Sequence, residues 1–136
     1  MRIAILCIAS ALASFFGVTW YALESGGVAI VATRPANGPE RRTHVWYVEP
    51  RDELWIEAGT PQNGWFVDLE NDRELHFSAD GIAARYRALP SSDPADQRRI
   101  RSLIRAKYGW RDRWVGMFVD SSKSVPVRLQ PLARGG

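Results

Sequence analysis

The N-terminal segment constrains this chain most, because the run from Ile3 to Leu23 carries no charged side chain. At about 1.5 Å per residue, a helix over this run is roughly 30 Å long, the thickness of the hydrocarbon core of a bilayer. Trp20 and Tyr21 lie near its C-terminal end, and aromatic side chains gather at membrane interfaces. The segment therefore predicts a membrane-spanning helix, with membrane lipid as the partner of residues 3–23.

A cleaved signal peptide is the alternative for the same segment. Ala11 to Ala13 has the small-x-small pattern of a cleavage site, but cleavage there leaves an apolar core of only about eight residues. The apolar run continues well beyond that point. We therefore expect a retained, single-pass anchor over residues 1–24, followed by one domain over residues 25–136.

Charge and cysteine content exclude several classes of function. The formal net charge is +3, which is too small to indicate nucleic-acid binding, so no nucleic-acid partner is expected. The single cysteine, Cys7, lies in the apolar segment, which excludes a disulfide framework and a zinc site built on cysteine pairs. Arg2 and the amino terminus precede the apolar segment, whereas Arg34, Arg41 and Arg42 follow it at a greater distance. The positive-inside rule then favours a C-terminal domain on the cytoplasmic side of the cell membrane.

Hydrophobic alternation in the rest of the chain predicts a mainly β fold of the α+β class. Strands are expected at residues 28–33, 43–49, 53–58, 74–78, 82–89 and 125–129. A short helix is expected at 65–70, and Asp80-Gly81 predicts the turn of a hairpin. Six strands with one long helix before the last strand indicate a small antiparallel split β-barrel with flanking helices.

The long helix is expected over residues 94–108, with Asp93 as its N-cap and Gly109 at its end. A single apolar stripe runs along it and consists of Ile100, Leu103, Ile104 and Tyr108. Four arginines are expected on the solvated outer face: Arg98, Arg99, Arg101 and Arg105. Residues 112–117 are expected to form a further short turn.

The sequence contains little that supports catalysis by the protein alone. His44 and His76 lie on separate expected strands without a carboxylate at metal-ligand spacing, so no metal site is expected. No serine stands in a nucleophile elbow, and no glycine-rich nucleotide fingerprint is present. Any catalysis therefore depends on a bound cofactor that the protein positions.

Two short stretches could bind an anion. Arg41, Arg42 and Thr43 stand at the entrance of one strand, and Ala58, Gly59 and Thr60 follow the strand expected to pair with it. Each has an ordinary alternative, as solvated turn arginines and as a strand-to-helix turn. The hairpin would bring both stretches together beside the tryptophans Trp46, Trp55 and Trp65. Flat apolar walls beside groups that bind an anion suit a planar, phosphorylated ring system.

Several segments carry a resemblance to a known family. They are GPERRTHVWY at 38–47, AGT at 58–60, GWFVDLEN at 64–71, KYGWR at 107–111 and VPV at 125–127. Together they resemble the split β-barrel flavin and deazaflavin oxidoreductases, and most closely the deazaflavin-dependent nitroreductase and quinone reductase family. The similarity extends over about residues 27–132.

The resemblance implies a barrel that binds deazaflavin or FMN and passes hydride to a quinone, a nitro compound or a similar lipophilic acceptor. It assigns cofactor binding to Arg41, Arg42, Thr43, Trp46, Ala58, Gly59, Thr60 and Trp65. It implies that Tyr108 faces the acceptor as the catalytic residue, and that two copies form a homodimer.

Two other functions stay open. The loop from Gly59 to Gly64 is shorter than the loop of the family and favours a membrane-tethered barrel that binds a ligand or partner without catalysis. The arginines from Arg98 to Arg105 could instead bind anionic lipid, which would make the domain a basic module recruited to a membrane surface.

Overall fold

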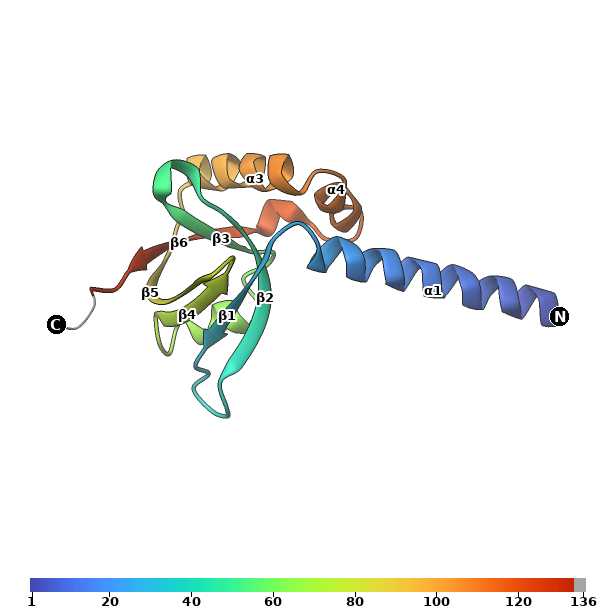
Figure 1. The fold of residues 1–136 in the computed structure, drawn as a ribbon, viewed down its shortest axis with the longest axis horizontal. Helices are drawn as coiled ribbons and strands as arrows, with labels where there is room; N and C mark the ends of the chain where they lie inside the picture. The colour runs from blue at the N-terminus through green and yellow to red at the C-terminus, as the bar shows by residue number, and fades with distance from the viewer. Residues whose placement is uncertain (134–136) are drawn as a thin grey trace.

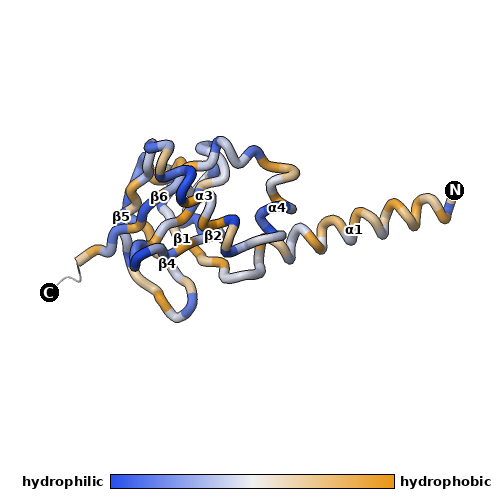
Figure 2. The backbone as a smooth tube through the Cα atoms, turned by 90° about the horizontal axis from the view of Figure 1, so that it is seen from above, coloured by the Kyte–Doolittle hydropathy of each residue, from blue (hydrophilic) through white to orange (hydrophobic). Residues whose placement is uncertain are grey.

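The computed structural model describes residues 1–133. An N-terminal helix, α1 (Arg2–Glu24), projects away from a body of strands and shorter helices (Figure 1). Its Arg2–Leu23 portion is long and apolar enough to cross a membrane, by length and composition, and none of the residues in its most apolar stretch is fully buried. Figure 2 shows hydrophobic residues along most of this helix.

Six antiparallel strands form a closed barrel, as the sequence pattern predicted. They are β1 (Val28–Thr33), β2 (Arg41–Val48), β3 (Leu54–Ala58), β4 (Glu74–Ala79), β5 (Ile82–Pro90) and β6 (Val125–Pro131). The strand order is β1-β2-β3-β6-β5-β4, and β1 pairs with β4 to close the barrel. The alternating residues that face inward form the main core, in which Val31, Ile56, Phe77 and Val127 are fully buried.

Three helices follow the strands at the barrel surface: α2 (Gly64–Asp68), α3 (Pro94–Tyr108) and α4 (Trp110–Gly116). Two 3-10 turns, η1 (Pro50–Asp52) and η2 (Ser121–Lys123), complete the elements in the described part of the chain. Helix α3 has the predicted bounds, and the side chain of Asp93 accepts a hydrogen bond from the Ala95 amide as its N-cap.

Helix α3 lies on the outer face of the barrel and forms a second core there. Ile100, Ile104 and Tyr108 are fully buried against Val48 of β2 and Trp55 of β3. The apolar stripe of the helix therefore faces the outward-pointing apolar side chains of two neighbouring strands. This packing fixes α3 over the place where β2 and β3 meet.

The chain turns sharply from α3 into α4 at Gly109, whose φ of 55° lies in the left-handed region that favours glycine. The turn that the sequence predicted at 112–117 is the helix α4, which begins at Trp110. Helix α4 lies beside the C-terminal part of α1 (Figures 1 and 2), where the Trp114 Nε1 donates to the Thr19 hydroxyl at 3.0 Å.

Candidate functional site

The barrel wall is split between β2 and β3. These strands pair only at Tyr47 with Ile56 and at Val48 with Trp55 among the described residues. Along residues 41–46, β2 pairs with β1 on one edge, and its other edge has no strand partner in the described part of the chain. The separation of the two strands opens a gap in the wall.

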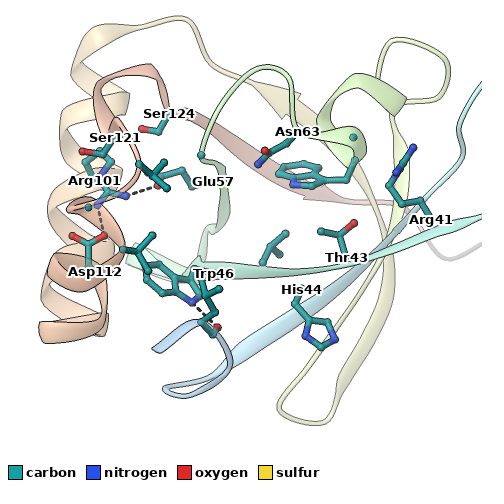
Figure 3. Close-up of a pocket in the computed structure, with 18 of the residues that line it drawn as sticks. Arg41, Thr43, His44, Trp46, Glu57, Asn63, Arg101, Asp112, Ser121 and Ser124 are labelled. Atoms are coloured by element: carbon teal, nitrogen blue, oxygen red, sulfur yellow. Dashed lines mark hydrogen bonds and ion pairs between the residues drawn. The ribbon is translucent and has the colours of Figure 1, made fainter. Parts of the chain in front are cut away.

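A pocket of about 520 Å³ lies at this gap. Its lining comes from β2, the end of β3, the start of α2, the α3–α4 region and the end of α1. Figure 3 shows Arg41 at one end of the pocket, and Glu57, Arg101 and Asp112 at the other.

Six of the predicted cofactor-binding residues line this pocket: Arg41, Arg42, Thr43, Trp46, Gly59 and Trp65. The antiparallel pairing of β2 with β3 brings the first half of β2 opposite the residues that follow β3, as the expected hairpin required. Trp65 is buried to 2% exposure in the short helix α2, so its ring forms a fixed wall of the pocket. The tryptophan Trp55, in contrast, lies in the second core under α3.

Arg41 is held by a buried acid. Its Nε donates to Asp68 Oδ2 at 2.8 Å, and the Thr33 hydroxyl donates to the same oxygen at 2.7 Å. A Cβ at Gly64 would lie 2.7 Å from Arg41 Nη1, so the absence of a side chain there gives the guanidinium its place. The ion pair with Asp68 fixes the position of the Arg41 side chain. Because this side chain is still 46% exposed, its charge is accessible at the edge of the pocket.

Two other predicted residues do not line the pocket. Ala58 is fully buried in the barrel core, because it follows Ile56 on the inward face of β3. The Thr60 hydroxyl donates to the side-chain oxygen of Gln62 within its own turn. The expected phosphate-binding loop therefore contributes Gly59 to the pocket, but neither of its two neighbours.

Tyr108 also lies outside the pocket, contrary to the expectation that it faces an acceptor. Its side chain is fully buried, and its ring stacks on Trp46 with the ring centres 4.3 Å apart. The hydroxyl donates to the Gly27 carbonyl at 2.7 Å and accepts from the Tyr47 amide at 3.1 Å. Tyr108 therefore joins α3 to the backbones of β2 and the residue before β1, and it supports Trp46 from behind.

The buried hydroxyl of Tyr108 should make the folded protein less stable in alkali. Burial raises its pKa from 10.0 to about 12, so the folded protein keeps a proton that the unfolded chain releases. The stabilisation is full below about pH 10 and is lost as the pH rises through about 12. Burial and the hydrogen bond to Asp80 raise the pKa of Tyr47 as well. Melting temperatures measured against pH should fall less steeply between pH 10 and 12 for Tyr108→Phe than for the wild type, and equal slopes would contradict this.

The sequence interpretation missed an acidic cluster at the other end of the pocket. Arg101, which was expected on the solvated face, is only 12% exposed and binds Glu57 of β3 and Asp112 of α4. Desolvation raises the pKa of Glu57, although the adjacent guanidinium opposes the shift. Glu57 Oε2 and Arg101 Nε are buried without a hydrogen-bond partner among residues 1–133. The position of Glu57 two residues after Trp55, on the face that α3 covers, is the signal that could have revealed the cluster.

The pocket also reaches the end of α1. The Trp46 Nε1 donates to the Leu23 carbonyl at 3.1 Å, and Leu23 itself lines the pocket. Val115, Gly116 and Val119, from α4 and the residues after it, line the same side. The pocket therefore has an apolar wall next to the N-terminal helix, in addition to the polar groups at its two ends.

Comparison with solved structures gives several matches of the same architecture. A conserved hypothetical protein from Mycobacterium tuberculosis superposes with a TM-score of 0.62 at 17% identity, over 88% of this chain and 91% of that one. The heme storage protein HutZ from Vibrio cholerae gives 0.62 at 11% identity, over 83% and 87%. An F420 reductase gives 0.54 at 16% identity, over 82% and 91%. These matches establish the split β-barrel fold.

No protein-family model matches the sequence, and no curated protein matches it.

Proposed function

We propose that this chain is a membrane-anchored oxidoreductase that uses deazaflavin or FMN to pass hydride to a quinone, a nitro compound or a similar lipophilic acceptor. One observation carries the proposal. The pocket at the split of the barrel combines two tryptophan walls, Trp46 and Trp65, with the cationic side chains of Arg41 and Arg42.

The pocket residues suit a planar ring with a phosphate group. A volume of about 520 Å³ falls within the range of small-molecule sites. Arg41, Arg42 and the Thr43 hydroxyl would hold the phosphate, because guanidinium groups match phosphate geometry. Trp46 and Trp65 would border the ring. When bound, the cofactor supplies the hydride chemistry, while these residues bind it, orient it and exclude water.

Two further findings support the proposal. One of the solved structures that share this fold is described as an F420 reductase. The apolar helix α1 ends at the pocket, which places the pocket close to a bilayer if α1 spans one. We propose that α1 is a single-pass anchor with the barrel on the cytoplasmic side, and that two copies form a homodimer.

The test is a titration of the full-length protein in detergent micelles with FMN and with a deazaflavin, followed by tryptophan fluorescence. We expect saturable quenching by one of the two cofactors. Arg42→Ala combined with Thr43→Ala should weaken binding roughly 10- to 100-fold, because each removed group takes away a hydrogen bond to an anion. Arg42 is the better choice for substitution than Arg41, since loss of Arg41 would leave the buried Asp68 without its cation.

Arg98→Ala is the matched control, because Arg98 is exposed on α3 and does not line the pocket. Its binding should equal that of the wild type. If the double variant bound the cofactor as tightly as the wild type, Arg42 and Thr43 would not be cofactor-binding residues.

A non-catalytic ligand-binding barrel is the second candidate. The observation in its favour is that Ala58 and Thr60 contribute no side chain to the pocket. A folded protein that binds neither cofactor, or that binds one without reducing a quinone, would favour this function.

A further inference from the structure

The segment that follows α3 exposes a set of large apolar side chains. The exposed fractions are 41% for Trp110, 65% for Met117, 58% for Phe118 and 43% for Val119. Three of these residues are consecutive, and such a group facing water is unfavourable for a soluble surface. Arg113 is exposed in the same segment, so an apolar environment is expected over residues 114–119 and a polar one beside Arg113. The contacts of the segment indicate which environment this is.

The same segment packs along α1 through aromatic side chains. The ring of Phe118 meets that of Phe15 edge to face, with centres 5.1 Å apart, and the Trp114 ring lies 6.0 Å from Phe15. Closer to the end of the helix, Trp110 stacks on Tyr21 at 6.1 Å. The segment thus runs beside the last turns of α1, with Phe118 farther from the barrel end of α1 than Trp110.

The contact with Phe15 defines a depth. Phe15 precedes Leu23 by two turns of helix, which corresponds to about 12 Å along the axis. If the run from Ile3 to Leu23 occupies the hydrocarbon, Phe118 lies within the hydrocarbon as well. Arg111 lies over the rings of Trp110 (5.1 Å) and Tyr21 (5.7 Å), where a cation would reach the lipid headgroups.

We propose that residues 114–119 insert into the same bilayer as α1, as a second, shallow membrane element, while Trp110, Arg111 and Arg113 lie at the level of the headgroups. This inference rests on the proposed anchor. Val115, Gly116 and Val119 also line the pocket, so insertion places one wall of the pocket against lipid. A lipophilic acceptor then reaches the pocket from the bilayer rather than from water.

Spin labels on the full-length protein test the proposal. Cys7→Ser provides a background without thiols, since Cys7 is the only cysteine of the sequence. Labels are attached at Met117→Cys and, separately, at Phe118→Cys. Met117 is 65% exposed, whereas Phe118→Cys removes the ring contact with Phe15, so the label at 117 decides where the two labels disagree. The protein is reconstituted in phosphatidylcholine vesicles, and collisions of each label with oxygen and with a water-soluble nickel chelate are measured.

Two control positions define the scale. Leu12→Cys lies on α1 and reports whether the anchor itself is inserted. Val67→Cys lies on α2, whose neighbouring residue Asp68 accepts a hydrogen bond from Thr33 at the end of β1 opposite to α1. We expect labels at 12, 117 and 118 to lose collisions with nickel and gain collisions with oxygen, while the label at 67 behaves as in water.

A label at 12 in lipid with labels at 117 and 118 in water would overturn the inference and leave the anchor intact. Such a result would point to a protein partner for residues 117–119. A label at 12 in water would overturn the anchor and the inference together.

Discussion

Arg101→Ala should lower the free energy of unfolding by about 3–5 kcal/mol, because it leaves the carboxylates of Glu57 and Asp112 buried without their shared cation. These two side chains are each 9% exposed, and Arg105, 3.8 Å from Asp112, compensates only part of the charge that remains. Denaturant unfolding of the full-length protein in detergent micelles measures the effect. The neighbouring Arg98→Ala, on the exposed face of the same helix, should change stability by less than about 0.5 kcal/mol.

A triple variant separates charge from packing. Arg101→Met combined with Glu57→Leu and Asp112→Leu removes all three charges while it keeps most of the side-chain volume. Replacement of a buried ion cluster by apolar groups is often neutral or stabilising. We therefore expect the triple variant to be more stable than Arg101→Ala. A single variant as mild as Arg98→Ala would show that water reaches the cluster in solution.

Tyr108→Ala should destabilise the protein by about 3–5 kcal/mol, because it removes a fully buried ring that packs on Trp46 and leaves a cavity under α3. Tyr108→Phe isolates the hydroxyl and should cost about 1–3 kcal/mol, since the Gly27 carbonyl and the Tyr47 amide lose their partner. Tyr21→Phe, at a 57% exposed position, is the control, with an expected change below about 0.5 kcal/mol. A Tyr108→Phe variant as stable as the wild type would mean that water satisfies both backbone groups.

The strands and the long helix could be predicted because their signals are local. A run rich in β-branched residues predicted β1 at its observed bounds, and Asp93 with Gly109 marked both ends of α3. The same local signals also indicated that two residues assigned to the site, Ala58 and Tyr108, are buried. Ala58 continues the inward alternation of Leu54 and Ile56, and Tyr108 completes the buried stripe of α3. In both cases the family resemblance suggested a role at the site, whereas the periodicity of the element indicated burial.

The acidic cluster could not be predicted from such signals. Arg101 is separated by 44 residues from Glu57 and by 11 residues from Asp112. Its burial depends on how α3 crosses β3 and on where α4 turns back, and no local pattern specifies either. The end of the pocket near Arg41 could be predicted, because the β2–β3 pairing places Thr43 near Gly59. The end near Arg101 depends on how the helices pack on the barrel.

The separation of β2 from β3 has a consequence for how the pocket recognises a ligand. From Arg41 to Trp46, one edge of β2 has no neighbouring strand among the described residues, and its peptide groups face the gap. A peptide group is present whatever side chain the residue carries, so hydrogen bonds made here survive amino-acid substitution. Evolution could therefore change most side chains around the pocket and still keep this part of the binding surface, and alanine scanning would not detect it.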